Sequence, residues 1–352
     1  MTTTMTAPTF SVVIQPSQRN FSVNEPEAIL EAAIRHHITL PYGCKDGACG
    51  CCKTRLVSGS VRHDAHLDAA LTAEEKASGL ILTCRAHPES DVVLEVKTVV
   101  EVDAPAVKKI PVRVQSMHRQ SDDVMILQLQ LPASEKFHYW AGQYIEFMLP
   151  DGSRRAYSMA NAPRADGKND GKIELHIRHM QGGKFTDQVF GSMKERSILR
   201  AEGPFGSFFL REKSDKPLIF LASGTGFAPI KALLEQIQQH NIQRPIHFYW
   251  GGRRPQDLYL HDWVVAQQSP MPHLTYIPVV SDATPEDAWA GRTGFVHRAV
   301  MDDFADLSAY QVYACGAPVV IESAKQDFTT ACKLPIEEFF ADSFTSEADK
   351  AR

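Results

Sequence analysis

The chain has 352 residues, of which 43% are hydrophobic and 22% are charged, and its formal net charge is −5. This composition is that of an ordinary globular protein, and the length predicts two or three domains. The apolar runs fall short of the roughly 20 residues of a membrane span, and the sequence has no basic block, so neither a membrane nor nucleic acid is expected as a partner.

The amino terminus reads MTTTMTAPTFSVV and has neither the basic start nor the apolar stretch of an export signal. The sequence therefore predicts a cytoplasmic protein. Clustered thiols in that reducing compartment bind metal or do redox chemistry more often than they form disulfides.

The first hundred residues alternate between strand-like and helix-like segments. The segments at 9–16 and 91–99 have strand composition, and NEPEAILEAAIRHH (24–37) has helical periodicity. Asn24 followed by Glu27 is a capping signal, so the helix is expected to start there. These elements predict a small α+β domain.

The stretch LPYGCKDGACGCCKTRL (40–56) contains four cysteines. Cys44, Cys49 and Cys52 have the spacing C-x₄-C-x₂-C, and 31 residues separate Cys52 from Cys84. This is the plant-type [2Fe–2S] spacing, and iron in such a cluster prefers anionic sulfur ligands. Cys51 does not fit the pattern and is interpreted as a bystander. Zinc binding is the alternative; a Rieske site is rejected because no histidine lies in the loop.

A polar, proline-bounded linker at 101–111 separates this region from a series of β-type segments. Between about 110 and 210 the short strand-like runs predict a barrel or sandwich. After Lys216 strand and helix patterns alternate, as in an open parallel α/β sheet. The predicted domains are 1–102, 109–212 and 213–352.

Three further motifs occur in these last two domains. RRAYSMAN (154–161) and QGGKFTD (181–187) lie in the β-rich part. LIFLASGTGFAPI (218–230) runs from an apolar strand into Gly224, Thr225 and Gly226, where glycines let a dinucleotide phosphate approach a helix N-terminus. The third glycine position of the Rossmann pattern holds Pro229, a good residue for opening a helix.

In this order the motifs resemble the ferredoxin–NAD(P)H reductase superfamily, preceded by a plant-type [2Fe–2S] ferredoxin domain. The subgroup that it resembles most is the CDP-6-deoxy-glucoseen reductase type, together with oxygenase reductase components. The resemblance implies a β-grasp ferredoxin, a six-stranded antiparallel β-barrel that binds FAD, and an open parallel α/β domain that binds NAD(P)H.

The resemblance also implies roles for residues of the barrel. Arg155 would neutralise the flavin pyrophosphate, Tyr157 would line the isoalloxazine ring, and Ser158 would act catalytically at its N5 atom. The residues expected at the pyrophosphate are Gly182, Gly183 and Thr186. His176, together with Arg178, is expected near the ribose and adenine of the flavin.

In the α/β domain the family likeness places Cys315, as a second catalytic residue, and Gly316 beside the nicotinamide. In the C-terminal segment IEEFFADSF (336–344), Phe340 is expected to cover the flavin, with Phe339 as the alternative. Arg253 is expected at the coenzyme ribose.

The choice of coenzyme depends on the residues after the second strand of the α/β domain. Arg254 and Asp257, which follow Arg253, point to a 2′-phosphate and to a free 2′-hydroxyl respectively. NADH is favoured because reductases of this arrangement usually use it, and NADPH is the alternative.

A function follows from the three modules taken together. A flavin accepts two electrons from NAD(P)H and releases them singly to the cluster, which passes them to an acceptor protein, either an oxygenase component or a deoxysugar dehydrase. One alternative is a free-standing NAD(P)H reductase of flavins, quinones or ferric chelates. Another is a zinc-stabilised interaction module on an inactive reductase. The sequence identifies neither the acceptor nor the oligomeric state.

Overall fold

The computed structural model describes residues 8–97, 103–164 and 171–346. The described residues form two compact units, one before Ala106 that also takes in residues 345 and 346, and one over Ala106–Phe344. The predicted end of the first domain at residue 102 lies outside the described residues.

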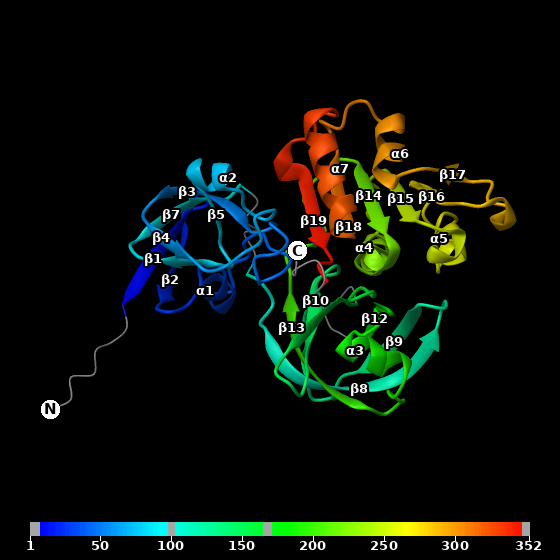
Figure 1. Cartoon of the computed structure of the whole chain (residues 1–352), viewed down its shortest axis with the longest axis horizontal. Coiled ribbons are helices and arrows are strands. Elements are labelled where there is room, and N and C mark those ends of the chain that lie inside the picture. Colours follow the sequence, from blue (N-terminus) through cyan, green and yellow to red (C-terminus); the bar gives the residue numbers. More distant parts are fainter. Residues whose placement is uncertain (1–7, 98–102, 165–170, 347–352) are drawn as a thin grey trace. The chain divides into compact units, whose positions relative to one another are not determined.

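The first unit is built on a mixed five-stranded sheet in the order β2-β1-β7-β3-β5 (Figure 1). Strands β1 and β7 are parallel, and the remaining pairs are antiparallel. A two-stranded ladder of β4 and β6 accompanies the sheet. The elements are β1 Thr9–Gln15, β2 Arg19–Asn24, α1 Ile29–Arg35, β3 Lys53–Ser58, β4 Val61–His63, α2 Ala73–Ala77, β5 Leu80–Leu82, β6 Ala86–Pro88 and β7 Val92–Glu95.

Helix α1 starts later than the sequence predicts. Asn24 ends strand β2, and its N–H donates to Glu27 Oε2 at 3.3 Å, so the capping pair forms before the helix. The helix is capped at Ala28, whose N–H donates to Glu31 Oε2. The predicted start at Asn24 is therefore wrong, while the predicted apolar face, which includes Ile29, is buried.

The first part of the second unit is a six-stranded antiparallel barrel in the order β11-β10-β13-β8-β9-β12. A bridge between Met159 and Leu175 links the ends of the series. Alternate apolar residues of the strands, among them Val112 and Leu127, fill the interior. The elements are β8 Lys108–Arg119, β9 Val124–Gln130, β10 Tyr144–Met148, β11 Arg154–Ser158, β12 Lys172–Arg178, α3 Lys184–Phe190 and β13 Ile198–Phe205.

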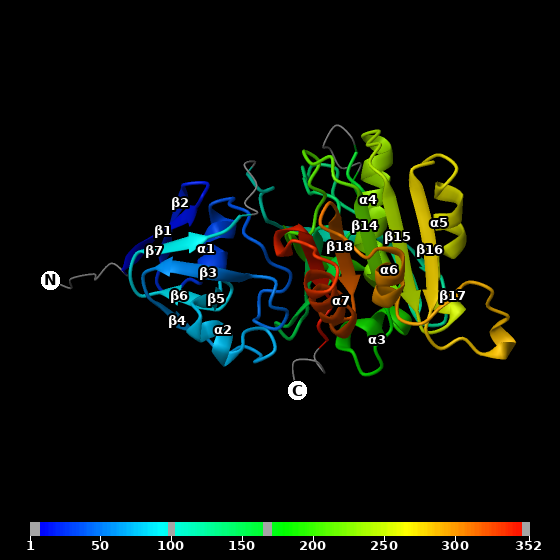
Figure 2. The same ribbon diagram turned by 90° about the horizontal axis from the view of Figure 1, so that it is seen from above.

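The rest of the second unit is an all-parallel sheet in the order β17-β16-β15-β14-β18-β19. Helices α4 and α5 pack on one face, and α6 and α7 pack on the other (Figure 2). The strands are β14 Leu218–Ser223, β15 Ile246–Gly252, β16 Leu274–Val280, β17 Arg292–Thr293, β18 Gln311–Gly316 and β19 Phe339–Ser343. The helices are α4 Phe227–Gln239, α5 His261–Gln267, α6 Val296–Asp303 and α7 Pro318–Thr330, with 3₁₀ turns at Gly224–Gly226, Pro255–Asp257, Pro285–Asp287 and Ile336–Glu338.

This strand order places a topological switch point between β14 and β18, where ligands bind in open α/β sheets. The fold class expected from the sequence is confirmed. Among the described residues, no helix is both long enough and apolar enough to cross a membrane.

Candidate functional site

The four predicted cluster ligands form two pairs of sulfur atoms. Cys44 and Cys49 each donate a backbone N–H to the other's sulfur at 3.3 Å, and the sulfurs of Cys52 and Cys84 are 3.2 Å apart. Two pairs of thiols suit the two irons of a [2Fe–2S] cluster. Gly47, at φ +80°, gives the loop a backbone conformation that L side chains rarely adopt.

The electrostatics of the cysteine loop call for a bound cation. The pKa of Cys44 is raised by its hydrogen bond with Cys49 and by burial, and the pKa of Cys84 is raised by Cys52 and by burial. Thiolates this close to one another repel, and ferric iron would supply the positive charge that keeps them deprotonated. The residues therefore fit a [2Fe–2S] cluster.

Cys51 lies in the same loop but differs from the four ligands. Its side chain is half-buried, and its Sγ donates to the carbonyl oxygen of Cys49 at 3.9 Å. Its thiol also interacts with that of Cys49 and contributes to the raised pKa of Cys49, so the bystander role of Cys51 stays a prediction.

The barrel motif RRAYS forms strand β11. Arg155 is half-buried, and its Nη1 donates to the carbonyl of Arg154 at 2.7 Å. The ring of Tyr157 packs against Phe185, at 5.3 Å between centroids, and burial raises the pKa of its hydroxyl. Ser158 is buried at the end of the strand.

The predicted pyrophosphate loop precedes helix α3. Gly183 is the N-cap residue of α3, and an added Cβ at Gly182 would meet no described atom within 4 Å, so the loop faces open space. The Thr186 hydroxyl donates to the Met180 carbonyl at 2.8 Å and so holds the loop closed. Open space beside a helix start fits a phosphate group, and a direct contact of Thr186 with it stays a prediction.

His176 lies inside the second unit with both ring nitrogens hydrogen-bonded. Nδ1 is 2.8 Å from the Tyr259 hydroxyl and Nε2 is 2.8 Å from Glu174 Oε1. Its predicted contact with the flavin therefore competes with two protein partners.

At the switch point the ends of β14 and β18 touch. A Cβ at Gly226 would lie 2.1 Å from the carbonyl oxygen of Cys315, and one at Gly316 would lie 2.3 Å from Ser223 Oγ. Only glycine permits this approach. The carbonyl of Gly224 accepts from the Trp250 indole at 3.0 Å; Thr225 completes the 3₁₀ turn, and Pro229 lies in the first turn of α4.

Ser158 and Cys315 converge on a carboxyl group that the sequence analysis did not single out. Ser158 Oγ donates to Asp342 Oδ2 at 3.2 Å, and Cys315 Sγ is 4.0 Å from the same oxygen. All three side chains are buried. Burial raises the pKa of Asp342 to about 6, against the opposing effect of the Ser158 hydrogen bond.

The aromatic residues of the C-terminal segment are placed differently from one another. Phe340 is buried, stacked on Tyr313 at 4.7 Å and lying under the Arg211 guanidinium. Phe344 is half-buried, and its N–H donates to the carbonyl of Gly316 at 2.8 Å. Phe344 was not among the residues predicted from the sequence, because the aromatic pair Phe339 and Phe340 comes earlier in the same segment.

Comparison with known proteins identifies each domain. Residues 12–89 match the 2Fe-2S iron-sulfur cluster binding domain, residues 111–210 the oxidoreductase FAD-binding domain, and residues 220–326 the oxidoreductase NAD-binding domain. These matches define an iron–sulfur flavoprotein oxidoreductase and confirm the expected cofactors, a [2Fe–2S] cluster, FAD and a nicotinamide dinucleotide.

Full-length relatives share this arrangement. The CDP-6-deoxy-L-threo-D-glycero-4-hexulose-3-dehydrase reductase of Yersinia pseudotuberculosis is 40% identical over 337 residues, 95% of this chain and 98% of the relative. Reductase component 1 of terephthalate 1,2-dioxygenase from Comamonas is 34% identical over 95% of this chain and 96% of the relative. The cytochrome P450 reductase GcoB of Amycolatopsis has a TM-score of 0.77 and 28% identity, with 96% and 99% of the two chains covered.

The chain belongs to the family of NAD(P)H-dependent iron–sulfur flavoprotein reductases that these relatives represent. Its function is electron transfer from a nicotinamide dinucleotide, through FAD and the cluster, to a partner protein.

The spacing of the cysteines leads to a prediction for the cysteine loop. Cys51→Ser is expected to keep the visible absorption and EPR spectra of the cluster, because Cys51 stands outside the C-x₄-C-x₂-C spacing of the predicted ligands. Cys52→Ser is expected to lose or alter both spectra. An altered spectrum in Cys51→Ser with a normal one in Cys52→Ser would reverse the ligand assignment.

A second prediction concerns Asp342 and pH. Because the folded-state pKa is raised to about 6, the carboxyl group stabilises the fold when protonated and loses that contribution as pH rises from about 4 to 6. The free energy of unfolding of Asp342→Asn should therefore exceed that of the wild type by on the order of 2–3 kcal/mol at pH 8. At pH 4 the two free energies should be nearly equal. An equal difference at both pH values would contradict the assignment.

Proposed function

We propose that the chain is the NADH-dependent reductase of a deoxysugar dehydrase, with FAD bound between the barrel and the switch point of the α/β sheet. The observation that carries the flavin site is the convergence of Ser158 and Cys315 on Asp342, since it joins the barrel motif to the nucleotide motif. The dehydrase is supported by 40% identity to dehydrase reductases, against 34% to the terephthalate dioxygenase component. An oxygenase partner is the second candidate.

The residues of the barrel supply the binding groups for FAD. Arg155 and the loop at Gly182 and Gly183 would hold the pyrophosphate, and Tyr157 would line the isoalloxazine ring. The bound flavin supplies the two-electron to one-electron conversion. Ser158 holds a hydrogen-bonding hydroxyl at the reacting edge, and Asp342 accepts from that hydroxyl. We assign the aromatic cover of the ring to Phe344 rather than to Phe340, because Phe340 is already stacked in the core.

The nucleotide phosphates are expected at the loop Gly224–Gly226. A Cβ at Gly224 would lie 2.7 Å from Arg178 Nη1, so this guanidinium stands against the loop. Arg178 Nε forms an ion pair with Asp123 Oδ2 at 2.9 Å, and Nη2 lies 3.6 Å from Asp257 Oδ1. A pyrophosphate would satisfy a guanidinium placed in this way.

The coenzyme ribose is expected where strands β15 and β16 end. Asp257 accepts from the N–H groups of Arg253 and Arg254, and so shapes the turn instead of facing a ligand. Arg254 pairs with Asp287 at 2.9 Å. Arg253, with a side chain 85% exposed, and Asp282, 64% exposed and 4.0 Å away, are the charged groups that face solvent here.

The partner can be tested with Cys84→Ser. The purified chain and NADH should support turnover of the 3-dehydrase of a nucleotide-linked 6-deoxyhexulose, and Cys84→Ser should lose that turnover while it still reduces ferricyanide at the flavin. Normal dehydrase turnover in Cys84→Ser would show that electrons bypass the cluster. Turnover only with an oxygenase component would reassign the partner.

The two exposed charges give a prediction for the coenzyme. Wild type should have the higher kcat/KM with NADH. Asp282→Ala should raise kcat/KM for NADPH about fivefold, because it removes roughly 1 kcal/mol of repulsion from a 2′-phosphate, and Arg253→Ala should lower it. Steady-state rates with both coenzymes measure this, and opposite responses would place the ribose elsewhere.

A further inference from the structure

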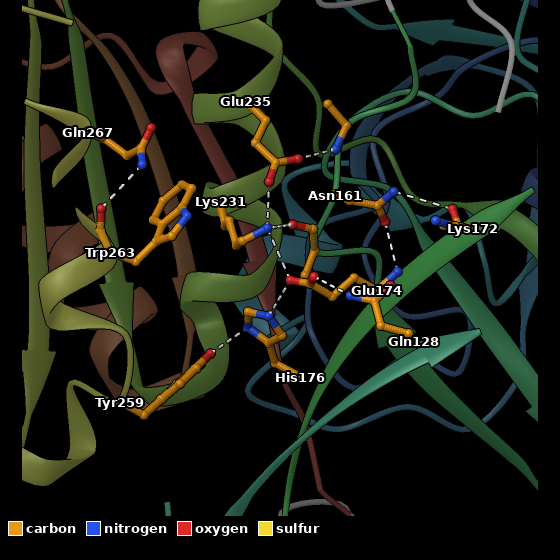
Figure 3. A network of polar contacts seen from close by, with 12 residues as sticks. Gln128, Asn161, Lys172, Glu174, His176, Lys231, Glu235, Tyr259, Trp263 and Gln267 are labelled. Atoms are coloured by element: carbon orange, nitrogen blue, oxygen red, sulfur yellow. Dashed lines mark hydrogen bonds and ion pairs between the residues drawn. The ribbon is translucent and has the colours of Figure 1, made fainter. Parts of the chain in front are cut away.

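A buried polar network joins the barrel to the α/β domain of the second unit, outside the motifs that bind cofactors (Figure 3). Its members come from strand β12 of the barrel, from helix α4 and from the segment before α5. We call it the interdomain network; it consists of Glu174, His176, Lys231, Glu235 and Tyr259.

Lys231 is the centre of the network. Its side chain is only 8% exposed, and its Nζ lies 3.0 Å from Glu174 Oε1, 3.2 Å from the Ala160 carbonyl and within hydrogen-bond reach of Glu235. Burial lowers the pKa of Lys231, but the two carboxylates raise it more, so the net shift is upward and the amine stays charged. The Trp263 ring lies 5.2 Å from the ammonium group.

His176 is held in one tautomer by its neighbours. Burial raises the pKa of Glu174, whereas its interactions with His176 and Lys231 lower it. The lowering prevails, and the pKa of Glu174 falls to about 2. A carboxylate only accepts, so His176 Nε2 carries the proton and donates to it. Nδ1 then accepts from the Tyr259 hydroxyl, whose pKa is raised by burial. Tyr259 therefore donates to His176, and His176 donates to Glu174, which is the final acceptor.

Most of the bonds of the network cross from one domain to the other. Lys231 on α4 reaches Glu174 on β12, and Tyr259 reaches His176. Two bonds between a side chain and the backbone add to them: the N–H of Ala162 donates to Glu235 Oε2 at 2.9 Å, and Gln120 Nε2 donates to the Tyr259 carbonyl at 2.9 Å. Directional bonds of this kind fix one register between two surfaces, whereas apolar contacts tolerate sliding.

The elements held by the network are those that carry the two reactants. Helix α4 starts directly after the loop Gly224–Gly226, and Lys231 lies in its second turn. On the barrel side, His176 is two residues before Arg178, which stands against that loop. A shift of α4 along β12 would therefore move the bound dinucleotide relative to the flavin.

We propose that the interdomain network is a positioning device for hydride transfer, in which Lys231, His176 and Tyr259 hold the nicotinamide loop in register with the flavin barrel. This proposal rests on the proposed function. It assigns His176 a positioning role, because both of its ring nitrogens are already used within the protein.

The test uses the full-length, flavin-loaded protein in anaerobic stopped-flow experiments. Lys231→Met leaves the two carboxylates without their cation, and Tyr259→Phe removes only the hydroxyl that donates to His176. Each should lower the rate constant of flavin reduction at saturating NADH by roughly 10- to 100-fold. The charge-transfer absorbance of stacked nicotinamide and flavin should weaken, and the isotope effect with 4-deuterated NADH should rise.

A second readout needs no coenzyme. Hydrogen exchange of the Ala162 amide, which donates to Glu235 across the interface, should become faster in Lys231→Met. Lys333→Met is the matched control, because it breaks the exposed ion pair of Lys333 with Asp306 in the same domain. It should change neither the rate nor the exchange.

Two outcomes would overturn the proposal. Wild-type rates and isotope effects in both Lys231→Met and Tyr259→Phe would show that the network has no influence on positioning. Loss of bound flavin or of folding, with an unchanged rate constant in the fraction that retains flavin, would make the network merely structural. If the wild type itself does not reduce its flavin with either coenzyme, the proposed function fails instead.

Discussion

The second unit depends on the contact between the ends of two parallel strands. Gly226, after β14, lies so close to the carbonyl of Cys315, at the end of β18, that any side chain there would clash. Cys315 on β18 is the register partner of Asp342 on the neighbouring strand β19, and Ser158 of the barrel donates to the Asp342 carboxyl group at the end of these strands. A barrel residue and two residues of the α/β domain thus share one buried position, and we propose that the flavin and the nicotinamide meet there.

The features that could be predicted from the sequence are local in the chain. The spacing of Cys44, Cys49 and Cys52 is set by a loop that wraps around one group, so it is visible without a structure. The run from an apolar strand into Gly224 and Gly226 is local for the same reason. Strand and helix alternation after Lys216 also predicted the parallel sheet, because each βα unit carries its own periodicity.

The remaining features need contacts between distant parts of the chain. Asp342 is 184 residues from its partner Ser158. The residues next to Asp342 in the sequence do not indicate that its carboxyl group is buried. Lys231 likewise looks like a solvated residue of an amphipathic helix until strand β12 is brought against it. The predicted helix start at Asn24 is wrong for a different reason. The hydrogen bond between Asn24 and Glu27 does form, but it lies at the end of a strand. A capping pair stabilises a turn whether or not a helix follows directly.

The central claim is that electrons enter at the flavin and leave through the cluster. Anaerobic stopped-flow mixing of the oxidised protein with NADH, with flavin absorbance and the EPR signal of the reduced cluster followed in time, measures this order directly. The account predicts that the flavin is reduced first, that the cluster signal follows, and that protein depleted of flavin gives no cluster signal. Reduction of the cluster by NADH at the normal rate in flavin-depleted protein would contradict it.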